Sequence, residues 1–105
     1  KSFVAEVILF PNTQIKSGDE IVIRYGTAEK KCKVQRIISE IDPVKLTVKA
    51  NTPDILKDEG VGKIELLALD PICIEKYSDF PELGRFVIEG KEGTAGAGIV
   101  LEIIN

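Results

Sequence analysis

Residues 28–41, Ala-Glu-Lys-Lys-Cys-Lys-Val-Gln-Arg-Ile-Ile-Ser-Glu-Ile, form the stretch that decides the fold. Apolar side chains first occupy even-numbered positions, including Cys32, and after Arg36 they occupy odd-numbered positions, including Ile37. One extra residue in a strand, a β-bulge, produces such a change of parity, and bulges are common where a barrel strand bends. The stretch therefore predicts a long, bent strand, with a helix over residues 34–41 as the alternative.

Six further stretches have the composition of β-strands, because they are rich in apolar, mostly branched residues between Gly, Pro, Asn, Asp or Ser. No segment places apolar residues at helical spacing over a dozen positions, which disfavours a helix-rich or βαβ design. The polar residues 43–60 predict one long connection. This pattern predicts an antiparallel barrel or sandwich of about seven strands. The expected strands cover residues 2–10, 20–25, 28–41, 63–69, 72–76, 84–89 and 97–104.

The first and last of these strands are apolar on both alternating faces. In residues 2–10, for example, Val4, Ile8 and Phe10 lie on the face opposite the other apolar set. A half-exposed strand would carry polar residues on one face. We therefore expect another domain to cover part of the outer face. Because the chain opens at Lys1 directly into a strand, without an initiator Met, we also expect it to be a fragment of a longer protein.

Composition limits the possible functions. The chain has 105 residues and a mass of 11.5 kDa, which predicts a single domain over residues 1–105. Its 14 Lys and Arg against 17 Asp and Glu give a net charge of −3, which excludes a general basic coat for nucleic acid. The sequence has no histidine, the commonest general base and metal ligand. We therefore expect no catalytic residues and no metal site in this fragment.

The two cysteines, Cys32 and Cys73, lie in alternating apolar stretches and not in a Cys-x-x-Cys pair. This setting predicts two buried, reduced thiols, and a disulfide between them would require their Cβ atoms to lie within reach. The longest uncharged run, residues 94–101, is too short to cross a membrane, and no positively charged segment precedes an apolar signal region. We therefore expect a soluble, cytoplasmic domain.

Two patterns that can carry chemistry have simpler structural interpretations. The glycine-rich residues 93–98 lack the Lys-Ser/Thr and the helix that a phosphate site needs, so we expect a turn into a closely packed strand. Glu75, Asp79 and Glu82 surround Tyr77 in the sequence. Carboxylate catalysis needs two such groups in a cleft with separated pKa values, so we expect a solvated loop here.

Residues 71–86, Pro-Ile-Cys-Ile-Glu-Lys-Tyr-Ser-Asp-Phe-Pro-Glu-Leu-Gly-Arg-Phe, carry the strongest functional signal. Gly84 permits an unusual backbone angle or a close approach of two chain segments. Arg85 beside Phe86 provides one cation that reaches solvent and one buried ring. The pattern fits a barrel corner with a surface arginine. It also fits a partner surface, because aromatic residues and arginine are enriched in interface hot spots.

These motifs resemble the C-terminal domain, domain III, of translational GTPases of the elongation factor Tu and eukaryotic elongation factor 1-alpha class. The resemblance extends over nearly the whole chain. Within the class, the chain is most similar to the GTPase subunit of the eukaryotic peptide chain release factor, or to the Hbs-type ribosome-rescue GTPase. The matching residues are 3–7, Gly18, 22–27, 32–34, 41–42, Pro53, 71–75, 80–86 and 98–103.

The resemblance implies an all-β, closed antiparallel barrel of six or seven strands. It also implies a non-catalytic docking domain that couples the stop-codon-recognising release factor to a GTPase domain elsewhere in the protein, where GTP and Mg²⁺ would bind. In the release-factor family the Gly-Arg-Phe strand contacts this partner, and that role carries over to residues 84–87. Flanking aromatic residues extend the expected site. The predicted partner-binding residues are Tyr77, Phe80, Gly84, Arg85, Phe86 and Val87, with Glu82 and Glu89 at the rim.

The chain departs from the family pattern at three places. The family's Arg-Asp after the Gly-Arg-Phe strand is replaced by Glu89 and Gly90, and the Thr-Val-Ala-Gly entry to the last strand is replaced at residues 94–98. Thr27 follows Gly26, where true elongation factors carry a histidine. The last departure disfavours an elongation factor that holds aminoacyl-tRNA. That function, a rescue GTPase and an unrelated small enzyme remain the alternatives, and the ribosome is an expected partner of any full-length translation factor.

We predict that residues 1–105 alone neither bind nor hydrolyse GTP. The sequence lacks the GxxxxGK[ST] phosphate loop, whose backbone and lysine hold the phosphates of a nucleotide. Isothermal titration calorimetry with GTP and Mg²⁺ should therefore show no specific binding. Saturable binding in the micromolar range would contradict the prediction.

Overall fold

The computed structural model describes residues 2–11, 13–42, 47–51, 55–56, 60–90 and 93–104. These residues form a nearly all-β domain whose α-helix content is a single four-residue helix. The helix considered for residues 34–41 is wrong, because that stretch is part of a 15-residue strand. The elements are β1 (Ser2–Leu9), β2 (Ile15–Lys16), β3 (Glu20–Tyr25), β4 (Ala28–Asp42), β5 (Thr47–Asn51), β6 (Ile55–Leu56), β7 (Val61–Ala68), α1 (Pro81–Gly84), β8 (Arg85–Gly90) and β9 (Gly93–Ile104).

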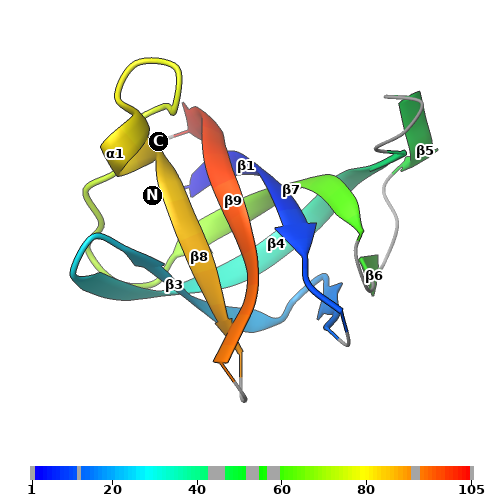
Figure 1. Cartoon of the computed structure of the whole chain (residues 1–105), viewed down its shortest axis with the longest axis horizontal. Coiled ribbons are helices and arrows are strands. Elements are labelled where there is room, and N and C mark those ends of the chain that lie inside the picture. Colours follow the sequence, from blue (N-terminus) through cyan, green and yellow to red (C-terminus); the bar gives the residue numbers. More distant parts are fainter. Residues whose placement is uncertain are drawn as a thin grey trace.

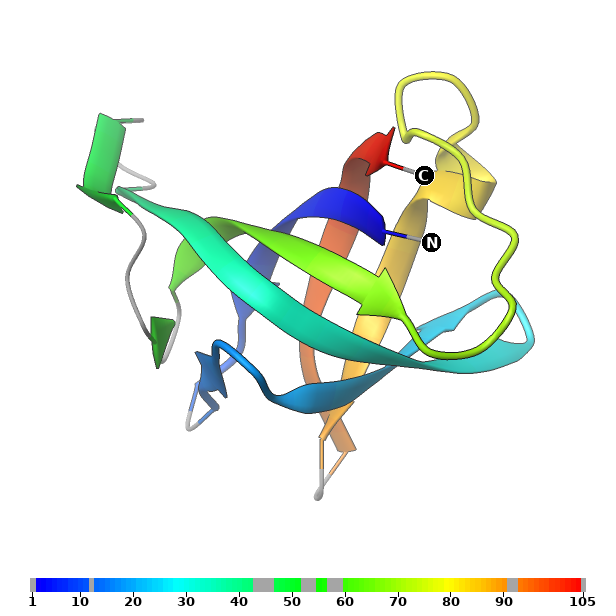
Figure 2. The ribbon, with the colours of Figure 1, turned by 180° about the vertical axis from the view of Figure 1, so that it is seen from behind.

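Six strands of the described chain close into an antiparallel barrel, which confirms the expected fold. They follow the order β3-β8-β9-β1-β7-β4, and an additional pairing of β3 with β4 closes the ring. β5 pairs with the far end of β4, while β2 and β6 form a small separate sheet. Figures 1 and 2 show the two sides of the barrel, with β8, β9 and β1 on one side and β3, β4 and β7 on the other.

The barrel interior is filled by alternate side chains from every strand of the ring. In β1 the odd-numbered residues are buried and the even-numbered ones face outward. Phe3 and Phe86 meet edge to face inside the barrel, with ring centroids 6.2 Å apart. The largest fully buried side chains are Phe3, Leu9, Ile23, Ile37, Leu56, Ile64, Leu66 and Ile88.

The parity change in β4 is a pair of irregularities in its pairing with β7, which confirms the expected bulge. The register shifts between Val34 and Arg36 and again between Ile37 and Ser39. Val34 and Ile37 are both buried as a result, although they lie an odd number of residues apart. Arg36 points outward, where its Nε donates to Glu65 Oε1 at 2.9 Å.

Two stretches differ from the sequence-based expectation. Residues 72–76 are not a strand, because this segment crosses the end of the barrel and does not run beside a strand. Its backbone makes separate hydrogen bonds to different elements in place of a ladder. The expected long connection over residues 43–60 contains β5 and β6 among its described residues. The end of β4 extends beyond the ring and offers unpaired backbone groups, and β5 pairs with them.

The two thiols occupy different environments. Cys32 is buried and Cys73 is exposed, and both are free, so the prediction of two buried thiols is wrong for Cys73. Cys73 belongs to the crossing segment, where the alternation of a paired strand does not apply. Burial, together with the smaller effect of the negative charge of Asp70, raises the pKa of Cys32 from 9.0 to about 12.

We predict that a thiol reagent at pH 8 modifies Cys73 rapidly and Cys32 only after unfolding. The thiolate is the reactive form, and Cys32 is both inaccessible and protonated at that pH. Because its pKa is raised in the folded state, the associated stability is present below pH 9.0 and falls as the pH rises toward 12. Counting modified thiols by mass spectrometry, with and without denaturant, is the test. Two rapidly labelled thiols in the native protein would contradict the prediction.

Gly98 in β9 faces the barrel interior and leaves no space for a side chain. A Cβ at this position would lie 2.6 Å from Phe86 Cζ and 2.8 Å from Val7 Cγ1. Gly96, two residues earlier, is similarly close to the carbonyl oxygen of Ile8. The expected close packing is therefore confirmed at Gly96 and Gly98, whereas the expected turn over residues 93–98 is wrong, because these residues are the first half of β9.

We predict that Gly98→Ala lowers the free energy of unfolding by about 1–3 kcal/mol, because the new methyl group overpacks the core. Chemical denaturation of the variant and the wild type gives the difference. Thr94→Ala, at an exposed position of the same strand, is the control and should stay within about 0.5 kcal/mol of the wild type. Equal stability of Gly98→Ala and the wild type would show that the core has room at this position.

Candidate partner-binding site

The segment between β7 and β8 crosses one end of the barrel and carries the residues that were predicted to bind a partner. The backbone N–H of Tyr77 donates to the carbonyl of Val100 in β9 at 2.9 Å. The backbone N–H of Cys73 donates to the hydroxyl of Tyr25 in β3 at 3.1 Å. The side chain of Ile74 is buried in the core between these two bonds. The segment is therefore fixed against the barrel by its own backbone.

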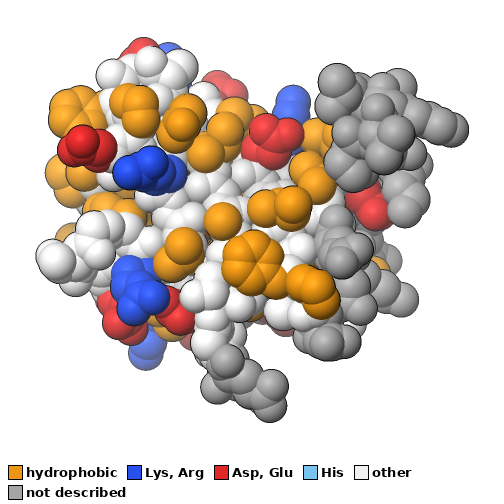
Figure 3. Space-filling view, viewed as in Figure 1, with side chains coloured by type: hydrophobic (Ala, Val, Ile, Leu, Met, Phe, Trp, Pro, Cys, Tyr) orange, Lys and Arg blue, Asp and Glu red, His pale blue; other side chains and the backbone are white. Residues whose placement is uncertain are grey.

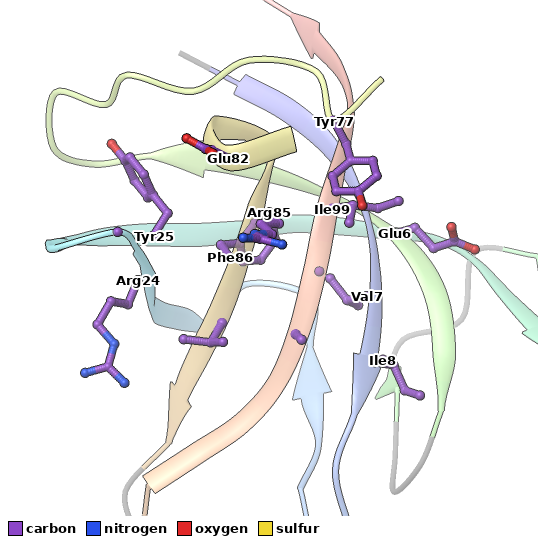
Figure 4. A pocket seen from close by; sticks show the side chains of 14 residues that line it. Glu6, Val7, Ile8, Arg24, Tyr25, Tyr77, Glu82, Arg85, Phe86 and Ile99 are labelled. Carbon is purple, nitrogen blue, oxygen red and sulfur yellow. The ribbon is translucent and has the colours of Figure 1, made fainter. Parts of the chain in front are cut away.

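Gly84 allows this segment to lie directly against the start of β8. A Cβ on Gly84 would lie 2.5 Å from the backbone nitrogen of Tyr77 and 2.8 Å from the carbonyl oxygen of Glu75. Gly84 does not adopt a left-handed φ angle. The expected close approach is therefore confirmed, and the unusual backbone angle is not observed. The approach places Tyr77 beside β9 (Figure 4).

A groove of about 890 Å³ lies on the outer face of the barrel, between this segment and the strands β8, β9, β1 and β3. We call it the β8–β9–β1 groove. Five of its lining residues, Tyr77, Glu82, Arg85, Phe86 and Val87, are ones that the sequence analysis assigns to the partner site or its rim. The remaining strands contribute Glu6, Ile8, Arg24, Ala97 and Ile99 among others. Figure 4 shows Arg85, Ile99 and Glu6 spread across β8, β9 and β1.

Strand register fixes two rows of side chains across the groove. In the charged row, Arg85 lies opposite Ile99, and Ile99 lies opposite Glu6. Arg85 and Glu6 are therefore separated by two strand spacings, about 10 Å. Ile99 stands between them and keeps the two opposite charges apart.

The second row, the apolar row, consists of Val87, Ala97 and Ile8. Val87 lies opposite Ala97, and Ala97 lies opposite Ile8. The middle residue is much shorter than its two neighbours, and it adjoins Gly98. The centre of the groove is therefore a hollow between two aliphatic side chains, one of which, Ile8, is 45% exposed.

The charges around the groove differ in whether they have partners. Arg24 Nη2 lies 2.6 Å from Glu89 Oε1, so these two side chains form an ion pair. Arg85, Glu6 and Glu82 make no ion pair or side-chain hydrogen bond with any residue that the structure describes. Arg85 therefore presents an unpaired guanidinium at the edge of an apolar surface.

The structure brings only part of the predicted site together. Tyr77, Glu82, Arg85, Phe86 and Val87 line the groove, although Phe86 is only 5% exposed. Phe80 is 48% exposed and lies outside the groove lining. The other two residues are also outside the lining: Gly84 is buried under the crossing segment, and Glu89 is paired with Arg24. The surface that a partner can reach is therefore smaller than predicted.

Sequence reasoning missed the contributions of Glu6, Ile8, Ala97 and Ile99 to this site. The sequence does carry a signal, because the first and last strands are apolar on both faces. Sequence alone does not give the register across three strands, so this signal predicts a covered outer face and does not connect it to the partner site. Figure 3 shows hydrophobic side chains over much of this face, interrupted by a few charged groups.

Two further observations concern only the residues that the structure describes. None of their His, Cys, Asp and Glu side chains gather in a group of three or more that could hold a metal ion. No helix among them is long and apolar enough to cross a membrane. The carboxylates Glu75, Asp79 and Glu82 are exposed, as expected for a solvated loop.

The fold and the groove define a small closed β-barrel domain with an apolar outer face edged by charges. The chain belongs to the GTP-eEF1A C-terminal domain-like family, whose family model matches residues 2–101. This match confirms the resemblance to domain III of translational GTPases that the sequence motifs indicated.

Several relatives are similar over nearly the whole chain. Elongation factor 1-alpha of Saccharolobus solfataricus is 31% identical over 97 residues, which are 92% of this chain and 22% of that protein. The same factor of Desulfurococcus mucosus is 35% identical over 102 residues, 96% of this chain and 23% of that protein. The chain therefore spans about a quarter of the length of these curated relatives.

The fold is also that of a solved structure. The crystal structure of Sup35 complexed with GDP superposes with a TM-score of 0.88 at 21% sequence identity. The match covers 99% of this chain and 26% of the Sup35 chain. At this identity the likeness establishes the barrel fold.

Proposed function

We propose that this chain is the non-catalytic C-terminal domain of a translation termination GTPase, the GTP-binding subunit of a release factor. In this role it docks the stop-codon-recognising release factor and couples it to the GTPase domain. GTP and Mg²⁺ bind in that other domain, and the full-length protein acts on the ribosome in the cytoplasm. The observation that carries the proposal is Arg85, an exposed cation at the edge of the β8–β9–β1 groove that forms no ion pair with the residues that the structure describes.

The chemistry of Arg85 suits a protein partner. A guanidinium presents several N–H donors in a planar fork that matches a carboxylate, or a pair of backbone carbonyls. Tyr77 stands beside β9 and supplies an aromatic surface with a polar tip, a residue type enriched in hot spots. Gly84 beneath Tyr77 fixes the position of both groups, so little order has to be created on binding.

The charge balance of the groove favours a protein over tRNA. Phosphate backbones are bound mainly by clusters of Lys and Arg. The described lining of the groove contains two arginines, of which Arg24 is already paired with Glu89, and two carboxylates, Glu6 and Glu82. A polyanion would meet little net positive charge here.

A second candidate is the corresponding domain of an elongation factor that holds aminoacyl-tRNA. The sequence identity of 31% to elongation factor 1-alpha of Saccharolobus solfataricus and of 35% to that of Desulfurococcus mucosus supports it. A third candidate, the same domain of a ribosome-rescue GTPase, differs in its partner, a paralogue of the release factor. Binding measurements with the three partners distinguish the candidates.

We predict that Arg85→Ala in the full-length protein weakens binding of the release factor by about 2 kcal/mol, roughly thirtyfold in Kd, as for a hot-spot truncation. Arg85→Lys should recover little of this loss, because lysine lacks the fork geometry. Calorimetric titration gives both values. Arg36→Ala, which removes an exposed arginine from β4 on the other side of the barrel, is the matched control and should bind as the wild type does.

Thermal unfolding of each variant shows whether a loss of affinity reflects a loss of fold. An unchanged Kd for Arg85→Ala with a native melting curve would contradict the role of Arg85. Tight binding of aminoacyl-tRNA by a wild-type protein that does not bind the release factor would favour the elongation-factor candidate.

A further inference from the structure

We propose that the β8–β9–β1 groove recognises a partner segment with three features in a fixed order. They are a carboxylate that contacts Arg85, a bulky apolar side chain that fills the hollow over Ala97, and a cation that contacts Glu6. The two charges of the partner lie about 10 Å apart, two strand spacings. The inference rests on the proposed function and specifies what the docked protein presents to this face.

The two charged contacts follow from the charged row. Arg85 and Glu6 carry opposite charges, and Ile99 separates them, so they do not neutralise each other. Neither has an ion-pair partner among the described residues, although Lys63 lies opposite Glu6 in β7. A carboxylate accepts several hydrogen bonds, so Glu6 can accept from a partner's cation beside Lys63. A partner with the reverse order of charges would place like charges together at both ends.

The apolar contact follows from the apolar row. Val87 and Ile8 flank the shorter Ala97, so a side chain inserted between them is contacted on two sides. Ile8 is 45% exposed in the free chain, and covering it removes apolar surface from water. An aliphatic or aromatic side chain therefore fits the hollow, whereas a second charge would be desolvated without a partner.

The chemistry of the proposed partner segment differs from that of two other candidate occupants of the same face, a nucleic acid and a second copy of the chain. A nucleic acid would be repelled by Glu6 and Glu82, and it carries no cation to match them. In a two-fold interface between two copies of the chain, Glu6 of each copy would contact Arg85 of the other. The experiment includes a measurement that detects each of these.

The experiment measures release-factor binding by variants of the full-length protein. Glu6→Lys should raise the Kd about tenfold, because it reverses the charge that meets the partner's cation. Glu20→Lys is its matched control, since Glu20 is also a strand carboxylate opposite a lysine, Lys33, but is exposed and lies outside the groove lining. Its Kd should match the wild-type value.

Ala97→Phe should raise the Kd about thirtyfold or more by filling the hollow. Gln35→Phe adds the same ring to an exposed position of β4 and should bind as the wild type does. Melting curves identify any variant that fails to fold. If Ala97→Phe fails to fold, Glu6→Lys still tests the proposal, because it changes only a charge on the outer face and leaves the core intact.

The outcomes separate this inference from the proposed function. Wild-type affinity in both Glu6→Lys and Ala97→Phe, with Arg85→Ala impaired, would overturn the three-part recognition and leave the proposed function standing. A wild-type protein without affinity for the release factor would overturn both. Sedimentation that shows self-association lost in Glu6→Lys, or tRNA binding lost in Ala97→Phe, would assign the face to a different occupant.

Discussion

Closure of the ring by the pairing of β3 with β4 is the constraint on which the rest of the structure depends. A closed barrel has a filled interior, so each strand must place one set of alternate side chains inside. The remaining set is displayed outside in rows that the strand register fixes. This constraint determines the arrangement of side chains in the groove. Arg85, Ile99 and Glu6 come from three adjacent strands, and the register places them in one row.

The outer surface of the barrel is divided by polarity. On β4, the exposed positions include Lys31, Lys33 and Arg36, which suits contact with water. On β8, β9 and β1, the outward positions include the apolar residues Val87, Ala97 and Ile8, which are poorly suited to contact with water. Larger apolar faces on soluble domains mark interaction sites. The crossing segment places Tyr77 on this apolar side. Tyr77 and Arg85, whose residue types are enriched in binding hot spots, therefore lie on the same surface.

Family membership and physical chemistry answer different parts of the functional question. The family match and the 31–35% identity to elongation factors establish what kind of domain this is. They do not distinguish a protein partner from tRNA, because the relatives are elongation factors 1-alpha whereas the solved structure with the same fold is Sup35. Under the proposed function, Arg85, which has no ion pair among the described residues, and the carboxylates Glu6 and Glu82 are the side chains that favour a protein. Partner choice is therefore best examined at these side chains.

The sequence alone determined the strand composition, the bulge in β4 and the close approach at Gly84, because alternation and glycine placement are local signals. It also located Arg85 and Tyr77. Tertiary structure decided that residues 72–76 cross the barrel end and do not form a strand, and that Glu6 belongs to the same surface as Arg85. The physical reason is strand register. Glu6 and Arg85 are 79 positions apart in the sequence, and hydrogen bonds between strands bring them into one row. No local pattern in the sequence encodes this pairing.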